Sequence, residues 1–304
     1  MSVSWLFFAF SGPVLWAIST HLDKYLVERY FKHIHPAVLL VFTALTNVVA
    51  LPFIMAAQPA VLGLGINAIA LMTVSGALLM GAMLFYLQAL QSAEASVVAP
   101  FFQVAFLFAI ALGYVVLGER LSGMQLLGAL LIIAGATTAA ARWETSGHVF
   151  NGRLVILMLA CAFTVALSSL IFKVFALRDE FWTTTFWLFV GEAAFGMAML
   201  AVGSLRRQFL DTLSTSTAAV VSINGVNEII NLIGGLGNRY ALLLAPLSLV
   251  QAVSSTTTVF VFLFGIMLSL FFPKLGREDL SRNELLRKGS AAVLVALGVG
   301  LMSR

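Results

Sequence analysis

Charged residues are scarce in this sequence. Only 10% of its 304 residues are Asp, Glu, Lys or Arg, whereas a soluble domain usually carries about 25%. Hydrophobic residues make up 61%, which is more apolar surface than a soluble core can bury. The sequence therefore predicts a multi-pass membrane protein. Basic residues that flank membrane spans account for the net charge of +4, so this charge does not indicate nucleic-acid binding.

Cysteine and the common catalytic signatures are also lacking. Cys161 is the only cysteine, so the chain cannot form an internal disulfide or a multi-cysteine metal site. The patterns His-Glu-x-x-His and Gly-x-Ser-x-Gly and the Walker phosphate loop are absent. We therefore expect no enzyme activity, no metal, no cofactor and no transport driven by ATP bound to this chain.

Long apolar runs lie between the charged clusters. A helix needs roughly 20 residues to cross a bilayer, and membrane strands would alternate polar and apolar residues, which these runs do not. The sequence predicts an all-α integral membrane protein of ten transmembrane helices. The predicted spans are 3–22, 36–57, 66–90, 95–117, 121–141, 154–173, 182–203, 217–238, 241–272 and 287–303.

The two halves of the chain resemble each other at an offset of 152 residues. At this offset "ALQSAEASVVAPFFQVAFLFAIALG" (89–113) aligns with "ALLLAPLSLVQAVSSTTTVFVFLFG" (241–265). An odd number of spans in each half makes the halves inverted relative to each other, and inverted repeats are typical of transporters with a site near mid-membrane. We expect a first repeat at 1–142, a linker at 143–152 and a second repeat at 153–304.

The segment "ASVVAPFFQVAFLFAIALGYVVLGERLSGMQLLGALLIIAGA" (95–136) resembles the end of an EamA repeat of the drug/metabolite transporter superfamily. The residues that carry this resemblance are Ala95, Ser96, Pro100, Gly118, Glu119, Gly128 and Gly135. The second half departs from the pattern, because Ala252 stands where the proline would fall. The resemblance implies two inverted five-helix repeats and transport of small metabolites through a central cavity.

The eighth predicted span carries amides and a carboxylate in "INGVNEIINLIGGLGNRY" (223–240). At about 100° per residue, Asn224, Asn227, Glu228, Asn231 and Asn238 fall within roughly 100° of arc. A charge at the bilayer centre costs at least about 2.5 kcal/mol, so such residues usually face protein or a wet cavity. We expect this face to contact substrate. The alternative is that the asparagines only form hydrogen bonds between helices.

Other polar residues in the spans are further candidates, each with a structural alternative. Glu192 is either a second carboxylate of the cavity, suited to carrying a proton, or an ion-pair partner of Arg239 or Lys173. Lys24 and Lys173 lie at repeat-equivalent positions, and they either extend to the membrane surface or neutralise an anionic substrate. The remaining candidates are Gln88, Tyr86 and Trp16, with Gln251 as a secondary one and Pro13 and Pro246 as helix breaks; packing or interhelical hydrogen bonds are their alternatives.

The leading hypothesis is a secondary active transporter of a small polar or amphiphilic metabolite, such as an amine or amino acid, that works by alternating access with a proton or exchanged solute. One alternative is a flippase for a lipid-linked headgroup, in which Lys24, Lys173 and Arg239 would meet phosphate. Another is a membrane receptor or subunit that does not transport. The partners expected are a small-molecule substrate and membrane lipid, without nucleic acid. Sequence leaves the oligomeric state open.

The plasma (inner) membrane is the expected location, but two signals for orientation conflict. In a ten-span arrangement the side with the N-terminus holds five basic residues, and the opposite side holds the other twelve of the seventeen. The positive-inside rule then places both termini outside, whereas the resemblance suggests that both are inside. The five are Arg120, Lys173, Arg178, Arg239 and Arg304.

Overall fold

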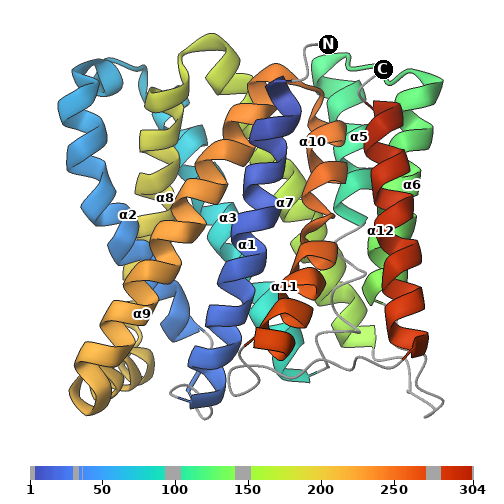
Figure 1. Ribbon diagram of the computed structural model, residues 1–304. Coiled ribbons are helices and arrows are strands. Elements are labelled where there is room, and N and C mark those ends of the chain that lie inside the picture. The colour runs from blue at the N-terminus through green and yellow to red at the C-terminus, as the bar shows by residue number, and fades with distance from the viewer. Residues whose placement is uncertain are drawn as a thin grey trace.

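Figure 1 shows the computed structural model of the protein, a bundle of helices standing side by side. It describes residues 4–29, 34–35, 37–92, 104–140, 152–271 and 282–302. The regular elements within these ranges are all helices. They are α1 (Ser4–Arg29), α2 (Ala37–Ala57), the 3-10 helix η1 (Pro59–Leu62), α3 (Ile66–Ser92), α5 (Val104–Leu117), α6 (Gly123–Ala140), α7 (Gly152–Arg178), α8 (Phe181–Ala201), α9 (Gly203–Leu244), α10 (Leu247–Ser254), α11 (Thr257–Phe271) and α12 (Arg282–Met302).

Seven candidate spans among the described residues are long and apolar enough to cross a membrane, and α5, α6 and α12 carry shorter apolar stretches. The chain is therefore a multi-pass membrane protein, as the composition predicts. The predicted spans 36–57, 66–90, 121–141 and 182–203 agree within a few residues with α2, α3, α6 and α8. Residues 95–103 of the fourth predicted span and 143–151 of the predicted linker lie outside the described residues, while Gly152 begins α7.

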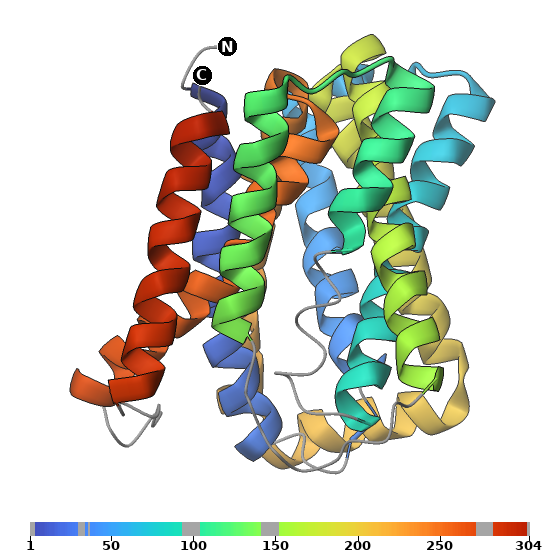
Figure 2. The ribbon, with the colours of Figure 1, turned by 90° about the vertical axis from the view of Figure 1, so that its right-hand side faces the viewer.

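The beginning of α1 and the end of α12 lie at the same end of the bundle (Figures 1 and 2). An even number of membrane crossings requires this arrangement. We call this end the terminal end. The helices pair in a regular way: α1 packs along α9, α3 along α7, α2 along α8 and α6 along α12.

The boundaries of the eighth and ninth predicted spans differ from the structure. In place of a helix over 217–238, α9 runs for 42 residues, and its first turns lie at the end opposite the terminal end (Figure 1). The predicted span 241–272 is interrupted twice, after Leu244 and after Ser254. Hydropathy alone does not detect such interruptions, because the residues on both sides of them are apolar.

Each interruption has a local chemical cause. At the first, Pro246 has no backbone N–H and cannot continue the ladder of α9. At the second, hydroxyl side chains donate to carbonyls three residues earlier: Ser255 to Ala252 at 2.6 Å, and Thr256 to Val253 at 2.7 Å. These local bonds compete with helical ones and satisfy polar groups that lipid would not.

Glycines allow α3 and α8 to cross with their backbones in contact. A Cβ placed on Gly76 would lie 1.9 Å from the carbonyl oxygen of Leu188, and one on Gly191 would lie 1.9 Å from that of Thr73. Without a hydrophobic force between helices in lipid, close backbone packing of this kind is a main source of association. The crossing fixes α8, which carries Glu192, against the centre of the bundle.

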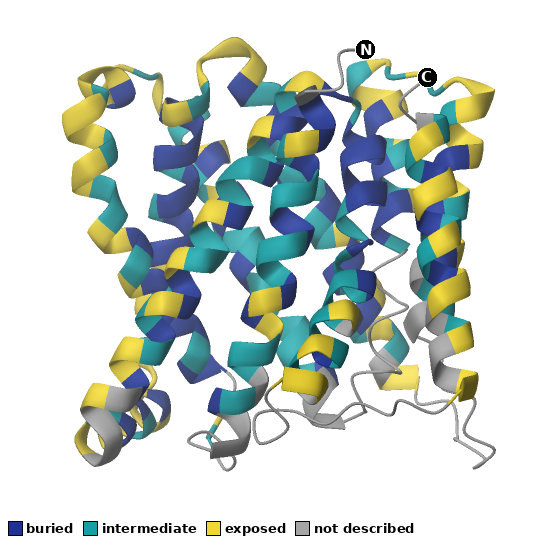
Figure 3. Ribbon diagram, in the orientation of Figure 1, coloured by how far each residue is buried: buried dark blue, intermediate teal, exposed yellow. Residues whose placement is uncertain are grey.

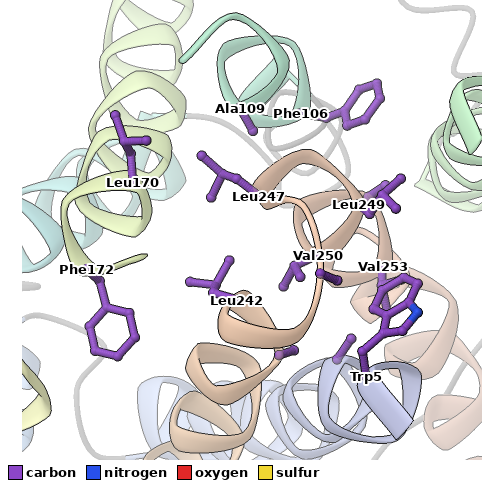
Figure 4. Close-up of a cluster of buried hydrophobic side chains, with 14 of the residues drawn as sticks. Trp5, Phe106, Ala109, Leu170, Phe172, Leu242, Leu247, Leu249, Val250 and Val253 are labelled. Atoms are coloured by element: carbon purple, nitrogen blue, oxygen red, sulfur yellow. The ribbon is translucent and has the colours of Figure 1, made fainter. Parts of the chain in front are cut away.

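The apolar core surrounds α10. Leu247, Leu249, Val250 and Val253 of this short helix are fully buried, and Figure 4 shows them between side chains of α1, α5, α7 and α9, among them Trp5 and Phe106. The outer faces of the bundle are the exposed ones in Figure 3, as expected where lipid replaces water. The polar face of α9 lies against α1, α2 and α8 instead.

Candidate functional site

The predicted polar arc of α9 points into the protein. Asn224, Asn227 and Glu228 are buried, with exposed fractions of 2%, 1% and 7%, whereas Val226 and Ile229 on the other face are 55% and 54% exposed. Figure 3 shows buried and half-buried positions alternating with exposed ones within the turns of α9. The helix is thus apolar toward lipid and polar toward its neighbours, which is the reverse of a helix on a soluble protein.

Two carboxylates meet on this face. Glu228 accepts a hydrogen bond from Thr43 Oγ1 of α2 at 3.1 Å, and Asn227 Nδ2 donates to Asp23 Oδ1 of α1 at 2.6 Å. The Asp23 and Glu228 carboxyl groups lie within electrostatic range of each other. Neither group forms an ion pair with a cation in the described part of the chain, so any negative charge on them is uncompensated there. We call Asp23, Asn224, Asn227 and Glu228 the carboxylate cluster.

The amides of the carboxylate cluster retain unused hydrogen-bonding capacity. Asn224 Nδ2 and Asn227 Oδ1 are buried and have no partner among the described residues. Most buried polar side-chain atoms do have a partner, and leaving one without costs about 1–3 kcal/mol. One free donor and one free acceptor, three residues apart beside two carboxylates, form a place that a polar ligand or water would satisfy.

Glu192 of α8 pairs with Arg239 of α9. The Arg239 Nη2 to Glu192 Oε1 distance is 2.6 Å, Asn47 donates to the other carboxylate oxygen at 2.6 Å, and the guanidinium carbon lies 5.1 Å from the Phe189 ring centre. The sequence left Glu192 as either a proton-carrying carboxylate of the cavity or an ion-pair partner of a cation. The contact with Arg239 agrees with the second interpretation. Its charge is compensated by Arg239, unlike those of Asp23 and Glu228.

Lys173 does not extend to the membrane surface. It is buried and pairs with Glu119 at 2.6 Å, and it donates to the backbone carbonyl of Ala245, where α9 ends. The second oxygen of Glu119 accepts from Leu247 N, the first residue of α10, at 2.8 Å. The ion pair therefore spans the break between α9 and α10, with its cation at a helix C-terminus and its anion at a helix N-terminus, as the helix dipoles favour.

The remaining predicted residues lie at varied distances from the carboxylate cluster. Tyr86 of α3 is half-buried within electrostatic range of Asp23, and Trp16 packs where α1 approaches Gly234 of α9. Gln251 donates to Ser169 at 3.0 Å, away from the cluster. Asn231 and Gln88 are half-buried and no hydrogen bond of their side chains is seen within the described ranges, and the side chain of Lys24 lies outside what the structure describes.

Asp23 and Glu119 are the residues of this arrangement that sequence reasoning missed as site residues. Asp23 sits beside Lys24 at the end of an apolar run, which favoured a position at the membrane surface. A signal was present nonetheless, because Trp16, Ser19 and Asp23 follow an i, i+3, i+7 spacing and share one helix face. As for metals, no group of three or more His, Cys, Asp or Glu gathers in the described portion of the chain.

Comparison with known proteins supports the membrane-transporter class. Residues 3–140 match the EamA-like transporter family. A solved crystal structure of a protein superposes with a TM-score of 0.63 at 18% sequence identity, covering 100% of this chain and 96% of the other. At that identity the likeness concerns the fold alone. No curated protein matches the chain.

Proposed function

We propose, from the match of residues 3–140 to the EamA-like transporter family, that this protein is a secondary active transporter of small amine-bearing metabolites in the plasma membrane. The observation that carries the proposal is the carboxylate cluster. Asp23, at the end of the first candidate span, and Glu228, within the span of α9, lie in electrostatic range of each other, and no cation among the described residues is paired with either. Charged groups in such a position are costly and usually functional.

An ammonium group fits this cluster chemically. It offers three donors and a positive charge, and the cluster offers two carboxylates and the free acceptor Asn227 Oδ1. The free donor Asn224 Nδ2 would serve an oxygen of the same ligand. Asp23 is half-buried, which leaves part of the cluster reachable.

Charge balance also suggests how transport would be coupled. Two carboxylates cannot both remain ionised and uncompensated within a membrane, so either protons or a cation must occupy them. We infer that the substrate cation and protons compete for Asp23 and Glu228, which makes proton exchange the natural driving force. Arg239, about 16 Å from Glu228 along α9 at 1.5 Å per residue and already paired with Glu192, does not suit the carboxylate of an α-amino acid bound at the cluster.

Alternating access between two inverted five-helix repeats is the motion that we propose, with ten membrane crossings in all. The packing of α1 on α9 and of α3 on α7 supports this arrangement. The offset between the repeats relates α1 to α7 and α3 to α9, so the two contacts are equivalent, each joining the first helix of one half to the third helix of the other. The breaks that flank α10 support it too, because discontinuous helices are typical of such transporters. The flippase alternative is weakened, because Lys173 and Arg239 are already ion-paired.

The test is ligand-induced thermal stabilisation of the detergent-purified protein. The probes are primary amines from ethylamine to spermidine, with zwitterionic amino acids and carboxylates as comparison sets. An amine at a hundredfold excess over its Kd should stabilise the wild type by about 2.7 kcal/mol, and less so as the pH falls, because protons compete for the same carboxylates. Glu228→Gln and Asp23→Asn should lose this stabilisation.

Arg178→Gln is the matched control, because it removes an exposed charge at the end of α7, far along the chain from the cluster. Equal stabilisation of the wild type and Glu228→Gln by the same amine would contradict the proposal. Uptake of the stabilising amine into proteoliposomes then separates a transporter from a receptor that only binds.

A further inference from the structure

A cavity of about 500 Å³ lies at the turn between α5 and α6, outside the carboxylate cluster. Figure 2 shows this turn at the terminal end of the bundle. The side chains around it combine charge, hydroxyl groups and aliphatic surface, and they belong to Ile110, Tyr114, Glu119, Arg120, Leu121, Leu126 and Ser248.

The hydroxyl group of Ser248 indicates a ligand in this cavity. Ser248 is only 3% exposed, it lines the cavity, and no hydrogen bond of its side chain is seen among the described residues. It is also the second residue of α10, whose first backbone N–H groups have no acceptor within the helix. Leu247 N is satisfied by Glu119, which leaves the next N–H groups and the Ser248 hydroxyl at the positive end of the helix dipole.

The charge at the cavity is positive. Both oxygens of Glu119 are engaged, one by Lys173 and the other by Leu247 N, so its charge is compensated. Arg120 is exposed and is not ion-paired with any residue that the structure describes. A guanidinium group beside helix N–H groups and a hydroxyl is an arrangement that binds phosphate.

The rest of the lining is aliphatic or aromatic. Leu126 is 39% exposed and Tyr114 is 57% exposed, on apolar helices that a bilayer would surround. Aromatic residues with a polar tip are typical of the membrane surface. A soluble anion would gain nothing from these aliphatic side chains, whereas an acyl chain would cover them.

We propose that this cavity binds a membrane phospholipid, with its phosphate at Arg120, Ser248 and the N-terminus of α10 and its acyl chain along Ile110 and Leu126. The inference is independent of the transported substrate. A lipid held here contacts the turn that carries Glu119, and Glu119 holds α10 in place. The lipid would therefore stabilise the helix break as well as the bundle edge.

The test uses dioleoyl phosphatidylglycerol as the probe on delipidated, detergent-purified protein, with thermal stability as the readout. Dioleoylglycerol has the same chains without phosphate, and glycerol 3-phosphate has the phosphate without chains. We expect only the phospholipid to raise the Tm of the wild type. Arg120→Gln should need about ten times more of it for the same shift, because a charge-assisted contact is lost, and Ser248→Ala should be weakened in the same direction.

Arg178→Gln is again the control. Like Arg120→Gln it removes one arginine charge, but at the end of α7, five residues beyond the Lys173 that contacts Glu119. This variant should respond to the phospholipid as the wild type does. An unchanged response of both Arg120→Gln and Ser248→Ala would overturn the site. A full shift with glycerol 3-phosphate alone would overturn the lipid assignment in favour of a soluble phosphate. A full shift with dioleoylglycerol would show that acyl chains alone are responsible and would overturn the phosphate assignment.

Discussion

The polar residues within this membrane protein fall into two kinds, those with compensated charge and those without. Glu192 and Glu119 are paired with Arg239 and Lys173 at 2.6 Å. Asp23 and Glu228 have only neutral hydrogen-bond donors among the described residues. A compensated pair is a structural element in lipid, whereas an uncompensated carboxylate invites a proton or a cation.

The first prediction at this scale concerns the Glu192–Arg239 pair. Arg239→Met should lower the free energy of unfolding by about 3–5 kcal/mol, because it leaves a buried carboxylate without its cation. The double variant Glu192→Gln/Arg239→Met should be more stable than Arg239→Met alone. Thermal unfolding of the three variants measures this coupling, and strictly additive effects would show that the pair does not contribute as a unit.

The second prediction concerns the free amide of Asn224. Asn224→Leu keeps the number of side-chain heavy atoms and removes a buried donor that lacks a partner among the described residues, so it should raise the free energy of unfolding by about 1–3 kcal/mol. The same change should weaken stabilisation by an amine that also carries an oxygen acceptor, because Asn224 Nδ2 can only donate. A loss of both stability and amine response would indicate that Asn224 has a structural partner instead.

At the scale of helices, the break between α9 and α10 is held by an ion pair with a defined polarity. Lys173 meets the carbonyl of Ala245, the C-cap residue of α9, and Glu119 meets the first N–H of α10. Gly118, with a φ of 64°, allows the chain to turn so that Glu119 reaches inward. The "GE" pair of the sequence thus has a physical role that its position in a turn did not reveal.

The third prediction tests this polarity by exchanging the charges. Glu119→Lys/Lys173→Glu retains two opposite charges but places each at the unfavourable helix end. We expect this double variant to be clearly less stable than the wild type, and Glu119→Gln, which still accepts from Leu247 N, to lie between them. Thermal unfolding of the wild type, Glu119→Gln and the double variant measures this order. A double variant as stable as the wild type would show that the ion pair stabilises the break regardless of which charge lies at which helix end.

The fourth prediction concerns the crossing of α3 and α8. Gly191→Ala would place a Cβ 1.9 Å from the carbonyl oxygen of Thr73, so the helices must separate and the yield of folded protein should fall sharply. Gly225→Ala is the matched control within α9, because no atom outside its own helical turn lies within 4 Å of its Cβ. That variant should gain about 0.5–1 kcal/mol from better helix propensity. Folded protein is measured by size-exclusion chromatography in detergent.

At the scale of the whole molecule, the helical bundle and most of its spans follow from hydropathy, because lipid tolerates little except apolar helices. The inward face of α9 also follows, because the period of the amides is that of a helix. The place of Asp23 in the carboxylate cluster could not be predicted from the sequence, because a charged residue next to Lys24 at the end of an apolar run is typical of a membrane boundary. Of the two interruptions of 241–272, the first is indicated by Pro246 in the sequence, whereas the second is not, because side-chain hydroxyls act locally there.

The reversed polarity of α9 has a consequence for how the protein is made. Of the seven candidate spans, those in α9, α1 and α8 are the least hydrophobic, and these three helices carry Glu228, Asp23 and Glu192. Such segments partition poorly into lipid one at a time during synthesis. α1 leaves the ribosome well before α9, its main partner, which contacts it from about two hundred residues later in the chain. Until α9 has been synthesised, Asp23 lacks its hydrogen bond to Asn227. During that time the carboxyl group must either be protonated or be kept from lipid by the insertion machinery.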